Sequence, residues 1–480
     1  MQHIKNVRLC ILLPVVLIIT VFLWSVPASF FGIAGLTVVQ QRTIAIFVFA
    51  VLMWIFEIVP NWVTSLIVIV GLLLSVSNKG LKFAMETGDD SIFMSSKEIM
   101  RSFADPVIML FMGGFVLAIV ASKYGMDVKL ARILLKPFGK NPRFVLLGFL
   151  VVISSFSMFM SDTATSAMFL TFLAPVLATL PDDEKGRVGL ALAIPVAANI
   201  GGIGTPIGTP PNATAVGILD NNGLTVSFAE WASRMIPFVI IMILIAWVVL
   251  QIAFPFKIKE IKIEIPQKNI RKTWRDYVAW ITFAVTVLLW MTEQLHGLSS
   301  NIVALIPLAV YSATGVFTSE DIRKINWSVL WLVAGGFALG YALNDTGLAK
   351  ALIGSIDFGS MSIVVVFIVA CLICYFLSNF ISNSATAVLL IPIMVAMGRG
   401  LMASSNAAAF AAMGGQKSLA VLVAMCASLA MLLPVSTPSN ALASSTGLVK
   451  TRDMARIGLI IGVTGIVLGY FWVTRFFQFP

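Results

Sequence analysis

The chain has 480 residues, of which 59% are hydrophobic and only 11% are charged, and its formal net charge is +10 at pH 7. Soluble domains are typically about 45–50% apolar and about 25% charged, so this composition excludes a string of soluble domains. The basic residues lie in short segments between apolar runs and not on one solvated face, which indicates membrane topology and argues against a nucleic-acid partner.

The apolar runs predict an all-α polytopic membrane protein with about 11 transmembrane helices, since a spanning helix needs about 20 mainly apolar residues. The first run follows Lys5 and Arg8 and has no clear small-residue cleavage site, so we expect a retained helix and not a signal peptide. The expected spans lie near residues 9–26, 43–59, 62–78, 106–122, 187–218, 235–255, 277–294, 299–317, 327–344, 417–447 and 456–474.

Two further apolar stretches, 144–180 and 361–398, are each long enough for two short helices and are broken near the middle by small polar residues. A break exposed to lipid would leave backbone polar groups unpaired, so each break must be buried in protein or line a cavity. We therefore expect two re-entrant helical hairpins, each of which enters and leaves the membrane on one side.

The distribution of Lys and Arg sets the expected orientation. With the N-terminus inside, most of the 32 Lys and Arg residues fall in loops on the inner side, and segment 257–275 is the richest. Cytoplasmic loops carry such an excess of positive charge. The sequence therefore predicts a multi-pass protein of the cell (plasma or inner) membrane with a cytoplasmic N-terminus.

Four short motifs occur twice in the same order, which indicates an internal repeat. The pairs are Trp54-x-x-Glu57 with Trp290-x-x-Glu293, Gly113-Gly114-Phe115 with Gly335-Gly336-Phe337, Ser161-Asp162-Thr163-Ala164-Thr165 with Ser382-Asn383-Ser384-Ala385-Thr386, and Gly208-Thr209-Pro210-Pro211-Asn212-Ala213 with Ser436-Thr437-Pro438-Ser439-Asn440-Ala441. An odd number of spans separates the two copies, so we expect the second copy to lie inverted in the membrane. Inverted repeats with interrupted helices are typical of secondary transporters, whose substrate binds near the midplane between the repeats.

The repeat predicts a division of the chain into four parts. These are an N-terminal helix and linker (1–42), a first inverted repeat (43–256) with hairpin 144–180 and broken helix 187–218, a basic cytoplasmic connector (257–276), and a second inverted repeat (277–480) with hairpin 361–398 and broken helix 417–447.

Prolines interrupt both broken helices, because proline has no backbone N–H to donate. Broken helices expose amides that suit anions and carbonyls that suit cations. The hairpin motifs and the breaks contain no Lys or Arg, so an anion there would be held by helix ends, hydroxyls and amides. Small Ser and Thr residues also serve close helix packing, but the four symmetric breaks together predict a binding site. At the two helix breaks, the predicted substrate-binding residues are Gly208, Thr209, Pro210, Thr437 and Pro438, and the predicted structural residues are Asn212 and Asn440.

The paired motifs resemble those of the divalent anion/sodium symporter family. The resemblance covers nearly the whole chain and includes Trp54, Glu57 and Pro60 at the start of the first repeat. It implies a bacterial di- or tricarboxylate transporter that carries succinate, malate, oxoglutarate or citrate, with sulfate carried in some branches. It also implies a homodimer in which a transport domain moves against a scaffold domain as an elevator.

The resemblance further implies which residues bind the transported species. The substrate carboxylates would contact Ser161, Asp162, Thr163, Ser382, Asn383 and Ser384. Sodium would bind at two places, one formed by Ser157, Ser161, Asp162 and Gly208 and the other by Ser378, Ser382, Asn383 and Ser436. Apart from Na+ or H+ as a coupling ion no cofactor is expected, and the expected partners are a small carboxylate substrate, the lipid bilayer and a second copy of the chain.

Two positions depart from the family pattern. Ser384 replaces Thr and keeps the hydroxyl, whereas Asp162 replaces Asn and loses an amide donor. Two unit charges 4 Å apart repel by about 4 kcal/mol at an effective dielectric near 20, so an ionised Asp162 cannot simply face a dianion. Asp162 therefore coordinates a cation, is protonated, or points away as a helix N-cap. Sodium symport and sodium-independent carboxylate exchange both stay open.

Other functions are compatible with parts of the pattern. A transporter of sulfate or another inorganic oxyanion, or a cation/proton antiporter on a related scaffold, is the main alternative. An enzyme is disfavoured, because the sequence has only two histidines and neither a Gly-x-Ser-x-Gly nor a His-Glu-x-x-His motif. We interpret Cys371 and Cys374 as buried packing, and the remaining acidic residues near the membrane ends as interfacial or scaffold groups. These acidic residues are Glu57, Asp105, Glu293 and Asp345.

Overall fold

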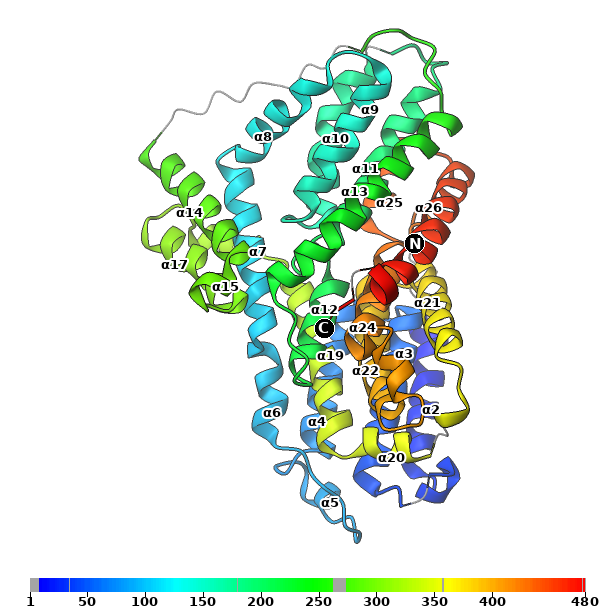
Figure 1. The fold of residues 1–480 in the computed structure, drawn as a ribbon. Helices are drawn as coiled ribbons and strands as arrows, with labels where there is room; N and C mark the ends of the chain where they lie inside the picture. Colours follow the sequence, from blue (N-terminus) through cyan, green and yellow to red (C-terminus); the bar gives the residue numbers. More distant parts are fainter. Residues whose placement is uncertain are drawn as a thin grey trace.

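Helices make up the regular structure, apart from one isolated β-bridge, in the part of the chain that the computed structural model describes, which is residues 8–33, 35–178, 180–261, 273–355, 358–476 and 478–479 (Figure 1). Within these residues seven helices are long and apolar enough to cross a membrane, and shorter apolar helices accompany them. The predicted all-α membrane fold is confirmed.

The N-terminal part of the chain forms four apolar helices at or near the predicted spans. Two of them begin at side-chain caps. Thr37 forms a capping box with Gln40 at one start, and Asp105 accepts a hydrogen bond from the Val107 amide at the other. The four helices are α2 (Leu13–Ser25), α3 (Val38–Phe56), α4 (Asn61–Ser75) and α7 (Pro106–Lys123).

The two stretches expected to form hairpins are each two helices joined by a short tip, and the two helices expected to be broken are interrupted before a proline. The first hairpin is α9 (Pro142–Ser157) and α10 (Asp162–Ala178), and the second is α21 (Ile363–Phe380) and α22 (Asn383–Met402). The first broken helix is α11 (Gly186–Gly202) and α12 (Pro210–Asp220), and the second is α24 (Gly415–Ser428) and α25 (Pro438–Ser445).

The remaining long helices connect and surround these pairs. They are α13 (Phe228–Ala253), α14 (Trp274–Met291), α16 (Ser300–Val303) with α17 (Leu305–Ala313), α19 (Trp327–Asp345) and α26 (Thr451–Phe471). Shorter helices lie between the long ones along the chain, namely η1 (Arg8–Leu12), η2 (Ala28–Phe31), α5 (Lys82–Met85), α6 (Ser96–Arg101), α8 (Met126–Leu135), α15 (Glu293–His296), α18 (Ser319–Ile322), α20 (Leu348–Gly354) and α23 (Ala407–Ala411).

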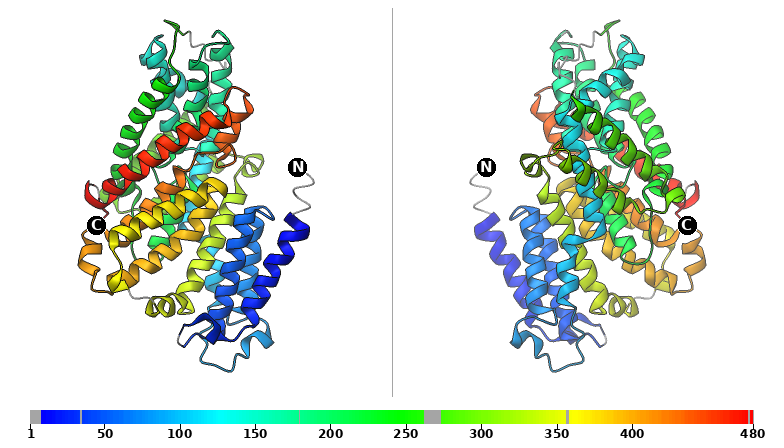
Figure 2. Two further views of the ribbon diagram at one scale, coloured as in Figure 1. Left: turned by 90° about the vertical axis from the view of Figure 1, so that its right-hand side faces the viewer. Right: turned by 90° about the vertical axis from the view of Figure 1, so that its left-hand side faces the viewer.

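Helices α11 and α24 form the centre of the molecule, since nearly all their side chains are buried. The first hairpin packs on α11 and α25, and the second packs on α24 and α12. In Figure 1 and in the two views of Figure 2, the α9–α10 hairpin lies at the top and the α21–α22 hairpin lies lower in the molecule. The two hairpins therefore approach the broken helices from different ends of the molecule.

The two halves pack glycine against the same kind of neighbour. A Cβ on Gly335 of α19 would lie 2.4 Å from Ser65 Cβ of α4, and a Cβ on Gly113 of α7 would lie 2.7 Å from Ala304 Cβ between α16 and α17. A contact this close tolerates only glycine. The paired Gly-Gly-Phe motifs of the sequence thus mark two equivalent helix crossings.

The two repeated tryptophans are also used in the same way. Trp54 Nε1 donates to the carbonyl of Asn61 at 3.2 Å, and Trp290 Nε1 donates to the carbonyl of Ser300 at 3.0 Å. Both rings are fully buried. Each Trp-x-x-Glu motif therefore fixes the turn between one helix and the next.

Loops expected on the inner side gather at one end of the molecule, which we call the basic end. Lys123 forms a 2.5 Å ion pair with Asp321, and Lys324 pairs with the same carboxylate at 3.0 Å. Burial favours the neutral form of Asp321, but the hydrogen bonds from both lysines outweigh it and hold its pKa well below the ordinary value. The Ile261 amide also donates to the carbonyl of Lys140, which joins the described part of the connector to the loop before α9.

Polar side chains tie four helices together at the opposite end. Asp105 accepts from Tyr341 at 2.6 Å and from Asn221 at 3.1 Å. The adjacent Asn222 is held by the Arg399 guanidinium and by Asn344 at 3.4 Å, and Arg399 also donates to Asn344 at 3.0 Å. We call this set of six residues the polar latch. It joins α12 and α22 to α7 and α19.

Candidate substrate site

Ser161 and Asp162 form the tip of the first hairpin. Ser161 caps α10, because its Oγ accepts from the Ala164 amide at 3.3 Å. The expectation that Asp162 could itself be the N-cap is therefore wrong, since Asp162 is the first helical residue and its carboxylate turns elsewhere. Ser157 Oγ lies 2.6 Å from Asp162 Oδ1 and 2.8 Å from the carbonyl of Ala198 on α11.

The first break packs directly against that carboxylate. A Cβ on Gly202 would lie 2.7 Å from Asp162 Oδ1 and 2.3 Å from Thr209 Cγ2. A Cβ on Gly208 would lie 2.3 Å from the carbonyl oxygen of Gly202. The absence of side chains at these two glycines lets the hairpin tip reach the break, so Ser157, Asp162 and Gly208 come together as the sequence predicts.

The second hairpin tip has the same cap but a neutral group beyond it. Ser382 Oγ accepts from the Ala385 amide at 3.2 Å and from Asn61 Nδ2 of α4 at 3.0 Å. Asn383, at the position of Asp162, has a buried Oδ1 without a hydrogen-bond partner in the structure. Ser378, the counterpart of Ser157, is fully buried on α21.

The second break is bound to the end of α21 through Asn379. Its Oδ1 accepts from the Leu432 amide at 2.8 Å, and its backbone carbonyl accepts from Ser436 Oγ at 3.0 Å. Asn379 precedes the predicted tip motif and was not singled out from the sequence. The one signal in the sequence was an Asn within an apolar stretch, three residues before the predicted tip motif.

The two breaks have nearly identical backbone conformations. Thr209 has φ −137° and ψ 150°, and Thr437 has φ −138° and ψ 151°. In each case the following proline occupies the first turn of the next half-helix, where its missing N–H would have no helical partner. The two predicted interruptions are thus one structure built twice.

The two asparagines after the breaks stabilise the ends of the preceding half-helices. Asn212 Nδ2 donates to the carbonyls of Ile203 at 3.3 Å and Thr205 at 2.8 Å. Asn440 Nδ2 donates to the carbonyls of Met431 and Leu433, both at 2.9 Å. A buried carbonyl without a hydrogen-bond partner destabilises the fold. The two amides supply these partners, and so they reduce the free-energy cost of each break inside the protein.

Side chains also link one break to the other repeat. Thr209 Oγ1 lies 3.2 Å from Ser428 Oγ on α24, and Asn199 Nδ2 on α11 lies 3.5 Å from Thr437 Oγ1. All four side chains are buried. The breaks therefore meet at the centre of the molecule and do not lie in lipid.

A polar cavity of about 520 Å³ opens beside the second tip and the second break. Its walls include Ser382 of the tip, residues from the break and the outer face of α25, and Glu57 at the end of α3. The lining residues are Glu57, Ser382, Pro434, Val435, Ser436, Thr437, Pro438, Ala441, Ser444 and Ser445. Helix α25 runs from the break toward Lys450, so the cavity is lined along one side by α25.

A family model described as the sodium:sulfate symporter transmembrane region matches residues 5–477. The chain belongs to the sodium:sulfate symporter family. Membership identifies it as a transporter and not an enzyme, and agrees with the resemblance found in the sequence.

Two relatives and one solved structure extend the comparison. An uncharacterized transporter of Haemophilus influenzae is 32% identical over 90% of this chain and 91% of its own length. The sodium-dependent dicarboxylate transporter SdcS of Staphylococcus saprophyticus is 27% identical over 86% of this chain and 82% of its own length. The crystal structure of the Alcanivorax borkumensis YdaH transporter is similar in fold, with a TM-score of 0.56 and 15% identity, and the match covers 86% of this chain and 98% of that one.

Some predicted residues of this symporter-family chain line the cavity and others lie beside it. Ser382, Thr437 and Pro438 are in its wall. Ser161 and Thr163 are not among the lining residues, although Thr163 is exposed and Ser161 is partly exposed. The structure therefore gives the second hairpin the more direct access to the cavity.

Glu57 lies in the cavity wall, which the sequence does not predict. The sequence predicts an interfacial or scaffold group there, and the structure adds that Glu57 is the ionisable residue among the lining residues. Its φ of +45° puts its backbone in the left-handed region. No other non-glycine residue in the described part of the chain has a positive φ. The repeated Trp-x-x-Glu motif was a signal, but it could not say which of the two glutamates faces the site.

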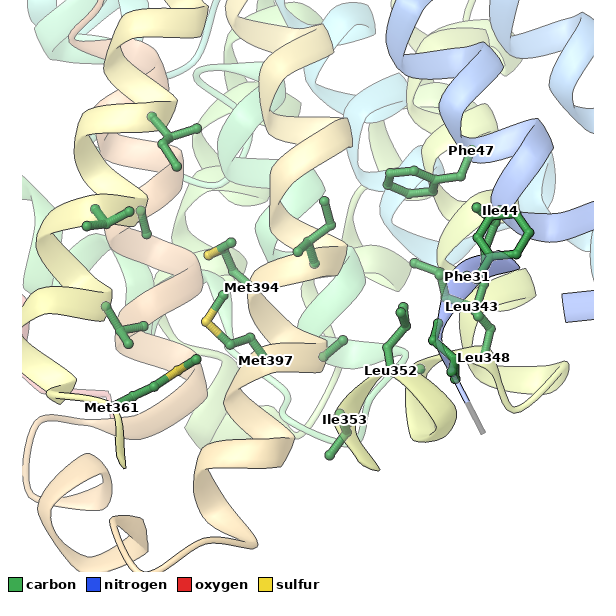
Figure 3. Close-up of a pocket in the computed structure, with 18 of the residues that line it drawn as sticks. Phe31, Ile44, Phe47, Leu343, Leu348, Leu352, Ile353, Met361, Met394 and Met397 are labelled. Atoms are coloured by element: carbon green, nitrogen blue, oxygen red, sulfur yellow. The ribbon is translucent and has the colours of Figure 1, made fainter. Parts of the chain in front are cut away.

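A second, larger hollow is lined almost entirely by apolar side chains. It has a volume of about 730 Å³ and lies between α3, α20, α21 and α22, where Figure 3 shows Phe47 and Ile44 facing Met394 and Met397 across it. The other labelled walls are Phe31, Leu343, Leu348, Leu352, Ile353 and Met361. We call it the apolar groove. Ser362 is the one hydroxyl among its lining residues, so it offers an anion far fewer hydrogen-bond donors than the polar cavity does.

Proposed function

We propose that this protein is a secondary active transporter of small di- and tricarboxylates of the succinate, malate, oxoglutarate or citrate class, coupled to sodium. The observation that carries the proposal is the polar cavity. Ser382 caps α22 and Thr437 caps α25, and both residues line the same cavity. Two helix N-termini thus converge on one hollow, and helix N-termini favour carboxylates.

The remaining hydroxyls complete the proposed anion site. Ser444 and Ser445 provide short polar side chains along α25, and the cavity wall contains no Lys or Arg. A site without a fixed cation binds a dianion well only if mobile cations accompany it. Substrate contacts at Ser161, Asp162, Thr163, Ser382, Asn383 and Ser384 are part of this proposal.

Buried polar atoms near the second tip fit a cation. Asn383 Oδ1, Thr386 Oγ1 and Ser439 Oγ are buried and have no hydrogen-bond partner in the structure. Unpaired buried oxygens are rare because their desolvation is costly. We propose that sodium binds among such oxygens and backbone carbonyls at the predicted set Ser378, Ser382, Asn383 and Ser436, with an equivalent site at Ser157, Ser161, Asp162 and Gly208. The dicarboxylate relatives named as sodium-dependent support this assignment.

Alternating access by an elevator motion is the proposed mechanism. The two hairpins and the two broken helices pack on one another, while the polar latch holds them to α7 and α19 at the end away from the cavity opening. In this proposal the two hairpins and the two broken helices form the moving body, and α7 and α19 belong to the scaffold. The latch joins body and scaffold on one side of their interface, and the polar cavity separates them on the other. A homodimer with its N-terminus and basic end in the cytoplasm belongs to the same proposal, because positive charge collects on that side.

Two observations favour alternative cargo or coupling. Asp162 supplies a carboxylate where sodium-coupled relatives are expected to have an amide, which favours carboxylate exchange without sodium. The description of the matching family names sulfate, which favours an inorganic oxyanion.

Transport by purified protein in liposomes tests all three. We expect labelled succinate or oxoglutarate to accumulate under an inward sodium gradient, with no internal dicarboxylate required, and excess unlabelled sulfate to compete poorly. Uptake that needs internal dicarboxylate and ignores sodium would establish exchange. No carboxylate uptake under either condition, with sulfate uptake instead, would overturn the proposed substrate class.

A further inference from the structure

The segment that joins α7 to the first hairpin carries a cluster of positive charge at the basic end. It consists of α8, the short turn η4 (Lys136–Phe138) and the first residues of α9. Four of its basic residues are exposed, namely Lys129, Lys136, Lys140 and Arg143, and we call these four the basic arm. Asp127 is the one acidic residue in residues 126–143, and it is buried.

Within the described residues, no carboxylate forms an ion pair with the basic arm. Two other lysines of the basic end, Lys123 and Lys324, are both paired with Asp321. Lys129 Nζ lies instead 5.2 Å from the ring centroid of Trp280 on α14. The described part of the chain therefore leaves the charge of the arm available to an anionic partner outside it.

Apolar side chains are exposed beside these cations. Ile133 and Leu134 of α8 are 55% and 41% exposed, and Phe144 of α9 is 49% exposed. Helices that combine Lys or Arg on a polar face with exposed apolar residues lie in the plane of a membrane surface. A soluble phosphate or another small anion would need only the cations. The combination therefore favours a lipid as the partner.

Two tryptophans indicate that the basic arm lies at the level of the lipid headgroups. Trp280 is about two turns after the start of α14, and Trp247 is about two turns before the end of α13. Trp247 Nε1 donates to the carbonyl of Arg143 at 2.8 Å, and its ring stacks on Phe144. Tryptophan is enriched at the boundary between membrane and water, since its ring is apolar and its N–H is polar.

The mirrored element shows that the fold itself does not require these charges. Like α8, helix α20 comes after a Gly-Gly-Phe helix and begins next to a left-handed glycine, with φ +62° at Gly125 and +75° at Gly347. Lys350 is the only charged residue in Leu348–Gly354. Positive charge on an inner loop also sets orientation in the membrane, but orientation does not require exposed apolar side chains beside the charge.

We infer that the basic arm binds the headgroups of anionic phospholipids in the membrane leaflet at the basic end. Each Lys or Arg near an anionic membrane surface strengthens binding, and Ile133, Leu134 and Phe144 contact the acyl chains beside the headgroups. The bound lipid holds the connection between α7 and the first hairpin at the membrane surface. This inference concerns lipid and does not depend on which substrate is carried.

Tryptophan quenching tests the inference on the purified full-length protein in phosphatidylcholine vesicles. A small fraction of the lipid carries bromine on its acyl chains, which quenches nearby tryptophans, and has either a phosphatidylglycerol or a phosphatidylcholine headgroup. We expect the brominated phosphatidylglycerol to bind with at least about tenfold higher apparent affinity, because several cations face it. This excess should shrink as sodium chloride is raised. Trp247→Phe/Trp280→Phe should lose most of the excess quenching, because these two rings lie against the arm.

Charge variants assign the effect to the arm. Lys136→Gln/Lys140→Gln/Arg143→Gln should lower the affinity for brominated phosphatidylglycerol by about tenfold and leave that for brominated phosphatidylcholine unchanged. Lys136→Arg/Lys140→Arg keeps the charge and should keep the natural excess.

The matched control removes three exposed cations from the opposite end of the molecule. Lys79→Gln/Lys82→Gln/Lys97→Gln changes residues in and near α5 and α6, far from α8 in Figure 1, and should keep the natural excess. Both leaflets of the vesicles contain the same lipids, so this control separates the arm from positive charge in general.

Three outcomes would overturn the inference. The first is equal quenching of the natural protein by the two brominated lipids, and the second is an excess that the arm variant retains in full. The third is an excess that inorganic phosphate abolishes at constant ionic strength, which would assign the cations to a soluble anion. The salt series and the tryptophan variants leave the arm unchanged, so the test does not depend on the folding of the arm variant.

Discussion

Asp162 and Asn383 hold the same position at the two hairpin tips but differ in chemistry. Ser157 Oγ is within hydrogen-bond distance of both Asp162 Oδ1 and the Ala198 carbonyl. A serine hydroxyl has one hydrogen to donate, whereas an ionised carboxylate can only accept. Both contacts are made at full strength when Asp162 carries a proton and donates it to Ser157. The local geometry thus favours a neutral Asp162 in this state.

Asp162→Asn tests this interpretation. Asn has the shape of a protonated Asp and stays neutral at every pH, and its amide can still donate to Ser157. We therefore expect uptake to continue, its pH dependence to flatten, and the melting temperature to change little. Uptake rates are measured in liposomes across pH with sodium held constant.

A carboxylate outside the site serves as the control for that variant. Asp276 caps α14 through Thr273 at an exposed position, so Asp276→Asn should lower stability slightly and leave the pH profile intact. An Asp162→Asn protein with the natural pH profile would show that the Asp162 charge has no part in coupling.

At the scale of helices, each break depends on one asparagine. Asn440 donates to two carbonyls in the break after α24, and Asn212 donates to three carbonyls at the end of α11 and in the break after it. The half-helices that follow present their N-termini to the cavity and its surroundings. Without the Asn440 amide, the two carbonyls would need another hydrogen-bond donor, either a backbone amide of a rearranged break or a water molecule.

Asn440→Ala is expected to lower the free energy of unfolding by about 1–3 kcal/mol, because two buried carbonyls lose their donor. Transport should fall by more than this loss of stability explains, since the N-terminus of α25 would shift. Thermal unfolding in detergent and uptake in liposomes are measured on the same preparation.

Asn406→Ala is the matched control. Asn406 Nδ2 also donates to two carbonyls, those of Gly359 at 3.2 Å and Met361 at 3.0 Å, but in an exposed loop far along the chain from the breaks. A smaller loss of stability and normal transport are expected there. If both variants lost the same stability and the same uptake, the hydrogen bonds of Asn440 would have no particular importance for the break.

The helices themselves could be predicted because their signals are local. Apolar runs of spanning length, prolines at 210 and 438, and small polar residues at the tips each specify a helix, a break or a turn within a few residues. The cap of the first hairpin could not be assigned, since Ser161 and Asp162 are both good capping residues and only the three-dimensional contact with Ser157 separates them.

At the scale of the whole molecule, the polar latch and the polar cavity lie toward opposite ends. The latch connects α12 and α22, which belong to the proposed moving body, to α7 and α19 of the proposed scaffold. Hydrogen bonds of this kind must break if the body moves. We therefore expect the latch to stabilise the conformation described here.

A reversible cross-link across the latch tests the motion. Asn222 and Asn344 touch through their side chains at 3.4 Å, so a short bis-thiosulfonate reagent can join cysteines placed at both positions. We expect this reagent to stop uptake by Asn222→Cys/Asn344→Cys, and reduction of the two disulfides that it forms to restore uptake. Cys10 is exposed and is replaced by Ser beforehand, whereas Cys371, Cys374 and Cys426 are buried.

A second cross-link within the scaffold provides the comparison. Lys123 and Asp321 are in direct contact and both belong to the proposed stationary part, so Lys123→Cys/Asp321→Cys treated with the same reagent should still transport. Continued transport by the cross-linked latch pair would contradict an elevator motion across this interface.

Neither the latch nor the position of Glu57 in the cavity wall could be predicted from the sequence. The latch residues Asp105, Asn221, Tyr341 and Arg399 are far apart along the chain, and no motif connects them.

Glu57 and Glu293 occur in the same Trp-x-x-Glu motif, and only the contact of the second hairpin tip with the α3–α4 turn distinguishes them. Both features depend on contacts between distant parts of the chain, whereas hydrophobic periodicity and prolines predict only local structure.

The apolar groove between α3 and the second hairpin bears on the rate of any such displacement. Apart from Ser362 its walls are hydrocarbon and thioether, and methionine side chains adapt their shape at little cost. We expect acyl chains of the surrounding bilayer to fill this groove, so that their viscosity sets the resistance to sliding along it. Turnover should then follow the fluidity of the surrounding bilayer, and a host that stiffens its lipids in the cold would slow this carrier without altering its affinity.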